Sequence, residues 1–389
     1  MKRLLTFFLI CFSFVEYTRA EDIIDYKYWD EGKLTWDDFQ DTLSLKGVPS
    51  TFNAFLRIEK TEKRDGNTRT IRPEAQACFD KRHSFADRQI QNENLLRLFQ
   101  LKYDLLEMYR RRLQTELNLG VVGSAADNRT RQYMDLYTEQ SKKAEQETEN
   151  GQNEIKLQEW EFYVTKELIE NPAPSIPRIS PRRFGYGFYL GTGASFPVGN
   201  IADYWAPAWQ INVGFDLAYA NTHLLCDFSA GTARTRQEIT VSNGQITDTW
   251  LRNGHNTYTS ISLGIGQQLV STKYFALMPY AGCIWSGYSD QAKIQEGRNE
   301  RTTLSYTNFN WTAGICFDYR FSTTISLVPS FWRGHREIFT ASIRTKLFIN
   351  REQFHNFKIA PDDNGSMLRG CKLGFSVACL GFSRLLQIK

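Results

Sequence analysis

The second half of the chain alternates between apolar residues and small or polar residues with a period of two. The alternation is clearest in the segments 184–196, 209–219 and 309–321, where aromatic residues such as Phe309 and Trp311 follow one face. A period of two predicts β-strands, because successive side chains of a strand point to opposite faces. Weaker alternation runs over 222–235, 257–270, 274–288, 322–332 and 337–349.

Strands of this length that are aromatic at both ends and apolar on one face predict a transmembrane β-barrel. The other face is rich in Gly and Ser and carries Asp216, Asp318 and Arg320, which suits a crowded lumen. The alternative is a soluble β-sandwich or lipocalin-like barrel, whose apolar face would point inward. Aromatic residues make up 14% of the chain, which favours a β-protein or membrane barrel over a helical membrane protein.

Loop lengths give the expected strand number. The expected long connections are 197–208, 236–256 and 289–308, and the expected tight turns are 220–222, 271–273 and a turn near 321–322. Long outer loops and short periplasmic turns are typical of outer-membrane barrels. This count gives eight strands that end near Ile349.

The segment 371–382 also alternates and does not fit that count. Because bacterial barrels usually have an even number of strands, nine strands are excluded. Residues 350–389 are therefore a periplasmic tail, or one expected hairpin is wrong and the barrel ends at this segment. Eight strands are favoured, and ten are the alternative. In its general form this half resembles the small outer-membrane β-barrels of Gram-negative bacteria, and side chains fill a lumen of eight strands.

The N-terminus has the pattern of a secretory signal peptide. Met1, Lys2 and Arg3 form a charged region, a short apolar region follows, and "TRA" ends at Ala20. Four prolines within 170–183 predict an extended spacer. The sequence thus predicts a signal peptide over 1–20, an α+β periplasmic domain over 21–169, a linker over 170–183, and an antiparallel transmembrane β-barrel over 184–389.

Three stretches of the N-terminal half resemble a family of secreted bacterial zinc-dependent proteases. They are "KLTWDDFQ" (33–40) followed by "VPSTFNAFLRIE" (48–59), the helix "LLRLFQLKYDLLEMYRRRL" (95–113), and "ETENGQNEIKLQEW" (147–160). The family has an HExxH motif on the helix and a third metal ligand in the last stretch. A helical HExxH binds zinc through two histidines one turn apart, and its glutamate activates the attacking water.

This chain has lost the residues that the resemblance would require for zinc. Leu98, Phe99 and Lys102 stand at the HExxH positions, and Asn150 stands at the position of the third ligand. The resemblance therefore implies a pseudoenzyme without a metal or other cofactor. A lysine on the apolar face of a helix needs a partner. The candidate charge partners of Lys102 are Asp104, Glu107 and Glu147; alternatively, its ammonium group reaches the helix edge while its stem packs.

The predicted function is that of a non-catalytic protein anchored in the outer membrane, whose periplasmic pseudo-metalloprotease domain binds a protein or peptide. The expected partners are outer-membrane lipid and a periplasmic or envelope protein. A formal net charge of +4 gives no indication of nucleic-acid binding. Two alternatives remain open, an active peptidase with an unidentified non-zinc site and a small transport pore.

Overall fold

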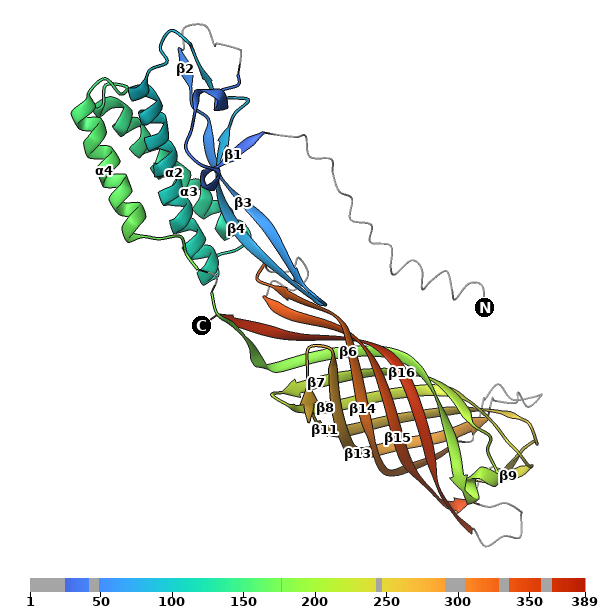
Figure 1. Cartoon of the computed structure of the whole chain (residues 1–389). Helices are drawn as coiled ribbons and strands as arrows, with labels where there is room; N and C mark the ends of the chain where they lie inside the picture. The colour runs from blue at the N-terminus through green and yellow to red at the C-terminus, as the bar shows by residue number, and fades with distance from the viewer. Residues whose placement is uncertain are drawn as a thin grey trace. The chain divides into compact units, whose positions relative to one another are not determined.

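The computed structural model describes residues 25–41, 49–175, 177–242, 247–290, 305–328, 336–357 and 366–388. The expected signal peptide over 1–20 lies outside the described residues. Contacts divide the chain into two units (Figure 1). The first, here called the helical unit, comprises Met1–Glu59 and Glu74–Ser175, and the second, the barrel unit, comprises Lys60–Pro73 and Ile176–Lys389.

The described residues of the helical unit form three helices and short strands. Its elements are β1 (Tyr26–Tyr28), the 3-10 turns η1 (Trp29–Glu31) and η2 (Trp36–Asp38), β2 (Ser50–Thr51), the start of β3 (Ala54–Asp65), the end of β4 (Thr68–Asp80), β5 (Phe85–Ala86), α2 (Glu93–Leu119), α3 (Ser124–Glu147) and α4 (Glu154–Glu170). The Asn92 side chain caps α2 by accepting a hydrogen bond from the Leu95 backbone N–H at 2.8 Å. Gly120 ends the helix at φ 125°, a conformation that favours glycine.

Helix α2 forms the core of the helical unit, because the apolar stripe predicted over 95–113 is buried. Leu105, Leu106 and Leu113 are fully enclosed and belong to the same cluster as Ala77 and Phe79 of β4. The Tyr103 hydroxyl donates a hydrogen bond to the Lys27 carbonyl oxygen at 2.6 Å, which satisfies a buried polar group.

The barrel unit is a closed ring of eight antiparallel strands. They are β6 (Ile179–Gly199), β7 (Ala208–Tyr219), β8 (Thr222–Arg234), β11 (His255–Gln267), β13 (Phe275–Asp290), β14 (Ser305–Ser326), β15 (Glu337–Phe357) and β16 (Ser366–Ile388). The last strand closes the ring by pairing with the first, from Gly370↔Gly199 to Ile388↔Ile179. Short additional strands, β9 (Ile239–Ser242) paired with β10 (Thr247–Trp250), and β12 (Val270–Ser271), lie in the connections.

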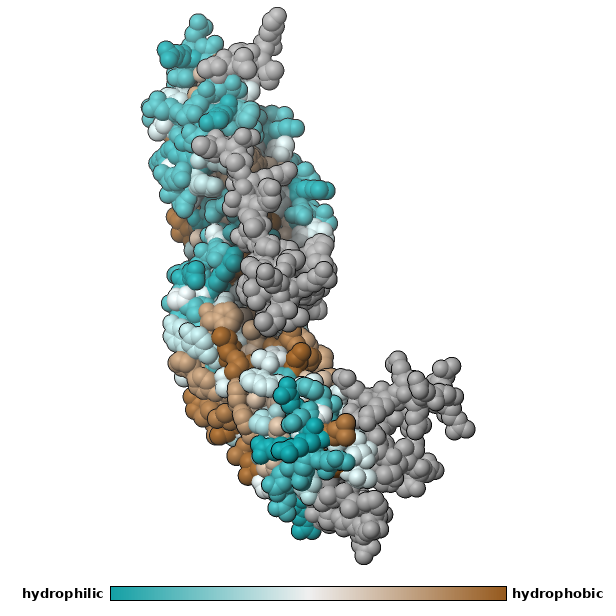
Figure 2. Space-filling view, turned by 90° about the vertical axis from the view of Figure 1, so that its right-hand side faces the viewer, coloured by the Kyte–Doolittle hydropathy of each residue, from teal (hydrophilic) through white to brown (hydrophobic). Residues whose placement is uncertain are grey.

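Each strand of the ring turns its apolar side outward, and Figure 2 shows hydrophobic residues on the part of the barrel wall that faces the viewer. The side chains are between 38% and 60% exposed at one representative residue per strand, namely Phe188, Phe215, Phe228, Ile261, Trp285, Phe317, Leu347 and Phe375. The opposite faces bury polar residues such as Asn212, Ser229 and Asn350. A soluble barrel would bury the apolar faces instead, so the soluble alternative does not describe this ring.

The expected turn near 321–322 and the expected end of the barrel near Ile349 are wrong. β14 continues to Ser326, and its ladder with β15 only shifts register between Arg320 and Ser322, as at a β-bulge. β15 then runs to Phe357, and β16 contains the alternating segment 371–382. Residues 350–389 therefore belong to the wall of the barrel, where described, and are not a tail. The ring has eight strands, not ten, although they are not the eight that the loop lengths predicted.

The expected fold class, a separate α+β domain followed by an antiparallel barrel, is also wrong. The sheet that contains the barrel continues into the N-terminal half, because β4 pairs with β14 in parallel from Thr68↔Thr323 to Ile71↔Ser326. β3 and β1 pair with β4, so twelve strands share one sheet. The reason is geometric: β13 begins at Phe275, opposite Tyr319, and leaves the end of β14 without a neighbour on that side.

The tip of the β3–β4 hairpin is held against the barrel strands by polar contacts. The Asn67 side chain donates hydrogen bonds to the backbone oxygens of Lys273 and Arg320 at 3.2 and 3.0 Å. The Thr323 backbone N–H donates to the Asn67 oxygen at 2.8 Å, and Lys273 pairs with Asp65 at 3.1 Å. Gly66, at φ +59°, allows the tight turn that these contacts need.

Truncation after Phe357 tests whether β16 closes the barrel. Without β16, the edges of β6 and β15 lose their partners, and an open edge is not tolerated in a lipid environment. We expect the truncated chain to lose the heat-sensitive compact band in SDS gels that a closed barrel gives after refolding in micelles. A truncated chain that keeps this band to the same extent as the full chain would show that 366–388 is dispensable.

Candidate functional site

The positions that resemble a lost zinc site lie in the core of the helical unit, except one. Leu98, Phe99 and Lys102 are 1%, 4% and 7% exposed on α2. Asn150 is exposed in the turn after α3, in a left-handed conformation at φ 57°. Among the described residues, no group of three or more His, Cys, Asp or Glu side chains is close enough to hold a metal ion.

Lys102 forms an ion pair with Glu145 of α3, with 2.5 Å between the ammonium nitrogen and the carboxylate oxygen. The ammonium group also lies 4.5 Å from the centre of the Phe52 ring and 5.8 Å from that of Phe99. Burial lowers the pKa of Lys102 from its ordinary value, and the charge of Glu145 opposes this shift.

The three candidate partners of Lys102 are bound elsewhere, so that prediction needs correction. Asp104 accepts hydrogen bonds from Trp29 and Gln100 at 2.8 and 2.7 Å. Glu107 pairs with Arg110 and Arg111 at 2.5 and 2.8 Å. Glu147 accepts a hydrogen bond from the Trp160 indole at 2.9 Å. Asp104 and Glu107 follow Lys102 by two and five residues, so their side chains point from other faces of α2. The packing of α3 against α2 instead brings Glu145 next to Lys102.

Charged residues fill the middle of the barrel lumen. Arg344 of β15 contacts Asp318 of β14 through Nε at 2.7 Å and Asp216 of β7 through Nη2 at 2.7 Å. Asp216 also contacts Nδ1 of His223 at 2.7 Å. One buried guanidinium group thus joins three strands, and its charge is balanced by carboxylates on both sides.

A second lumen cluster surrounds Lys346, two residues along β15. Its ammonium group lies 2.7 and 2.8 Å from the two carboxylate oxygens of Asp227, which also accepts a hydrogen bond from the Tyr189 hydroxyl. The ammonium group lies 4.8 Å from the centre of the Tyr280 ring. Sequence reasoning missed Arg344 and Lys346, although their i, i+2 spacing within an alternating segment was a signal that both point inward.

Aromatic residues close the end of the lumen that carries the long connections. Trp205, between β6 and β7, stacks on Tyr288 with 4.4 Å between ring centres, and it is fully buried. Trp250 is 1% exposed in the same cluster. Lys372 lies 3.7 Å from the centre of the Tyr258 ring and pairs with Glu352 at 3.1 Å. This cluster leaves the lumen filled rather than open.

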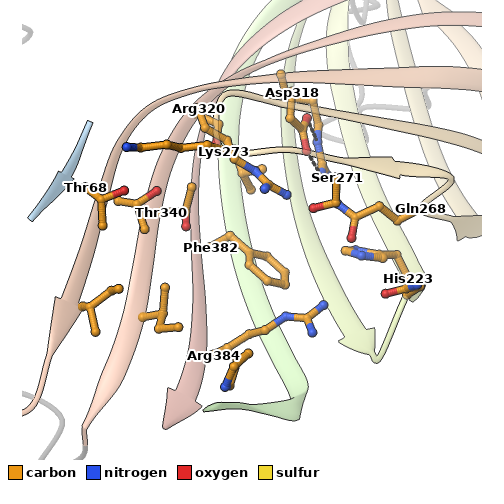
Figure 3. A pocket seen from close by; sticks show the side chains of 18 residues that line it. Thr68, His223, Gln268, Ser271, Lys273, Asp318, Arg320, Thr340, Phe382 and Arg384 are labelled. Carbon is orange, nitrogen blue, oxygen red and sulfur yellow. Dashed lines mark hydrogen bonds and ion pairs between the residues drawn. The ribbon is translucent and has the colours of Figure 1, made fainter. Parts of the chain in front are cut away.

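A cavity of about 380 Å³ lies at the other end of the barrel unit, among the short turns (Figure 3). We call it the basal cavity. Turn residues Asn221, Gln268 and Lys273 line it, and Arg344 and Asp318 line it toward the middle of the lumen. Arg320, Arg384 and His223 also line it, and its lysine and arginines outnumber its carboxylates.

No protein-family model matches the sequence, and no curated protein matches it. Among solved structures, the chain is similar to Ail, the attachment invasion locus protein of Yersinia pestis, with 11% identity over 51% of this chain and 97% of that one, at a TM-score of 0.26. It is also similar to the outer membrane protein OprG of Pseudomonas aeruginosa, with 9% identity over 54% of this chain and 99% of that one, at a TM-score of 0.27.

The third similar structure is the N-terminal β-barrel domain of OprF from Pseudomonas aeruginosa, with 10% identity over 54% of this chain and all of that one, at a TM-score of 0.23. These three structures are outer-membrane β-barrels. At such identities and TM-scores, the function has to be inferred from this chain's own residues. The resemblance of the N-terminal half to a protease family stays a prediction.

Opposite effects of Lys102→Met and Glu145→Gln on stability would test the ion pair. The methionine removes a buried charge and leaves Glu145, whose side chain is 34% exposed, free to hydrate, so we expect the free energy of unfolding to stay unchanged or rise by about 1 kcal/mol. Glu145→Gln leaves the buried ammonium group without a counter-charge. This substitution should lower the free energy of unfolding by about 2 kcal/mol. Denaturation followed by circular dichroism at 222 nm reports the helices, and Lys143→Met on exposed α3 surface is the control.

The same lysine should make the helical unit more stable at alkaline pH. Since burial lowers the pKa of folded Lys102 below 10.5, the unfolded chain binds more protons between the lowered pKa and 10.5. Stability should therefore rise with pH through this window, and Lys102→Met should remove this part of the rise. An unchanged pH dependence in the variant would contradict the assignment.

Proposed function

We propose that the chain is a non-catalytic outer-membrane protein whose filled barrel anchors an interaction unit on the periplasmic side. The observation that carries this proposal is the outward apolar face on all eight strands of a closed ring. A continuous apolar wall of this kind is costly in water but favourable in the hydrocarbon core of a bilayer. The polar lumen supports the same assignment, because transmembrane barrels alternate apolar-out and polar-in.

The arrangement of connections supports a periplasmic helical unit. The ring begins at Ile179 and ends at Ile388, and these two residues pair. The short turn 220–221 lies at that same end, whereas 200–207, 235–242 and 247–254 lie at the opposite end. Because outer-membrane barrels place short turns in the periplasm, the chain enters the barrel from the periplasmic side. Among the described residues, no helix is long and apolar enough to cross a membrane.

The filled lumen supports an anchor over a transport pore. Arg344, Lys346 and Lys372 are each at most 5% exposed and lie with carboxylates across the lumen, while Trp205 and Trp250 fill one end. Water and ions would have to displace buried ion pairs to pass, which leaves uncompensated charges. The role of an anchor needs no such opening.

An apolar stripe on α4 supports the role of the helical unit in protein binding. Ile155, Phe162 and Ile169 are 73%, 73% and 74% exposed. Their spacing of seven residues places them on one face of the helix, as in helices that pack along a partner helix. Such a stripe would also suit a pseudo-metalloprotease domain that binds a protein or peptide without cleaving it. Exposed apolar residues in one line mark a binding surface more often than scattered ones do.

Conductance measurements in planar bilayers test the filled lumen. We expect the full chain, once inserted, to give no steady channel currents, since ion pairs and aromatic side chains occupy the lumen. A porin reconstituted in the same lipid is the positive control. Reproducible single-channel steps that scale with the amount of this chain would contradict the anchor and favour a pore.

A photo-crosslinking amino acid at position 162 tests the stripe on α4. We expect it to yield discrete crosslinked products in intact cells, because a partner covers Phe162, and Ile155→Asp should reduce their yield. The control places the same amino acid at position 142, where Lys142 is exposed on a different helix, α3. Equal products from both positions would contradict a specific binding surface.

A further inference from the structure

The basal cavity carries arginines that have no carboxylate partner among the described residues. Arg320 of β14 donates only to the Thr272 carbonyl oxygen, at 2.7 Å. Arg384 of β16 donates only to the Ala220 carbonyl oxygen, at 2.6 Å. Asp318, the one carboxylate that lines the cavity, is held by Arg344. The cavity thus has two guanidinium groups with donors to spare, and guanidinium groups favour oxyanions that accept two hydrogen bonds.

Buried polar atoms that lack partners give a second, independent observation. His223 is 5% exposed and uses Nδ1 for Asp216, whereas its Nε2 is buried without a hydrogen-bond partner. Arg344 is 1% exposed, and its Nη1 also lacks a partner. Both residues line the cavity. Buried polar atoms are normally satisfied, so these two atoms indicate a site for a polar ligand.

Apolar side chains form the remaining wall of the basal cavity. Ile325, Ile338 and Leu380 line it, and so does Phe382. The Phe382 ring lies 5.7 Å from the His223 ring and 5.5 Å from the Arg384 guanidinium carbon, between centres. Figure 3 shows Phe382 between Arg384 and Arg320. A ligand that binds the guanidinium groups of this cavity therefore places the rest of its structure against an apolar wall.

We propose that the basal cavity binds a phosphate monoester that carries an apolar chain. Arg320 of β14, Arg344 of β15 and Arg384 of β16 all line the cavity, and Figure 3 shows Arg320 and Arg384 on the two sides of Phe382. Donors from three guanidinium groups, among them the unpartnered Nη1 of Arg344, suit the three terminal oxygens of a phosphate better than the two coplanar oxygens of a carboxylate. A volume of about 380 Å³ exceeds what phosphate alone would fill and lies within the usual range for ligand sites. The proposal does not depend on whether α4 binds a protein.

Calorimetric titration with hexyl phosphate tests the site in the full chain, in nonionic detergent micelles. We expect one binding site, with at least tenfold weaker binding after Arg320→Gln or Arg384→Gln, because each substitution removes a charge-assisted hydrogen bond. Thr340→Phe adds a ring to the cavity lining, keeps every charge, and should weaken binding as strongly. Arg351→Gln is the matched control, since Arg351 is exposed at the other end of the barrel and contacts Gln353. Each variant is first checked for the heat-sensitive compact band.

Any of three results would overturn the proposal. One is the absence of binding to hexyl phosphate in a chain that gives the compact band. A second is an equal loss after Arg351→Gln, which would mean nonspecific attraction to positive charge. Inorganic phosphate should bind at least tenfold more weakly than hexyl phosphate, and equal affinity, the third result, would contradict the role of the apolar wall. A parallel experiment with phosphatidic acid in nanodiscs distinguishes a lipid from a soluble ligand. If this lipid displaces hexyl phosphate, the natural ligand is a lipid headgroup. If hexyl phosphate stays bound, the natural ligand is a soluble monoester.

Discussion

Charge pairing inside a closed ring is the constraint on which the barrel depends. Arg344 reaches Asp216 and Asp318 on two other strands, so its partners are available only when the register of all three strands is correct. Losing one partner would leave a buried charge, which is more costly than losing most apolar contacts. The outward faces of the same strands gain stability only in an apolar surrounding. Each strand therefore satisfies two environments at once, and a shift by one residue would expose charges to lipid.

Strand β14 links the two halves of the sequence. Up to Tyr319 it pairs with β13 and β15, as any strand of a barrel does. Beyond the shift at Arg320, it pairs with β15 on one side and with β4 on the other. The parallel pairing with β4 satisfies backbone groups of β14 that would otherwise form an open edge. The N-terminal half thereby contributes strands to the sheet of the barrel, which the proline-rich segment 170–183 gave no reason to expect.

The sequence predicted what local periodicity controls and missed what depends on distant pairing. Alternation along 184–196 and 309–321 correctly assigns the apolar faces to the outside, because inward and outward positions differ in chemistry residue by residue. The two alternating segments 309–321 and 322–332 predict a turn where they meet, yet Ser322 and Thr323 continue the same strand, whose partners lie far away in sequence. In the same way, Lys102 predicts a carboxylate partner, but its neighbours on α2 at helical spacing, such as Leu98 and Leu106, are apolar. Only the packing of α3 supplies Glu145.

The unequal lengths of the strands also account for the position of the basal cavity. β7 ends at Tyr219, opposite Phe184, whereas β6 and β16 remain paired as far as Ile179 and Ile388. In the middle of the ring, an inward-pointing basic side chain pairs with an acidic side chain of the opposite wall, as Arg344 pairs with Asp216. Where the shorter strands stop, the opposite wall offers turn residues, and among the described residues Arg320 and Arg384 contact carbonyl oxygens but no carboxylate. Positive charge is therefore in surplus at the end of the barrel that holds the basal cavity. A bound oxyanion supplies the counter-charge that acidic residues of the opposite wall supply farther inside.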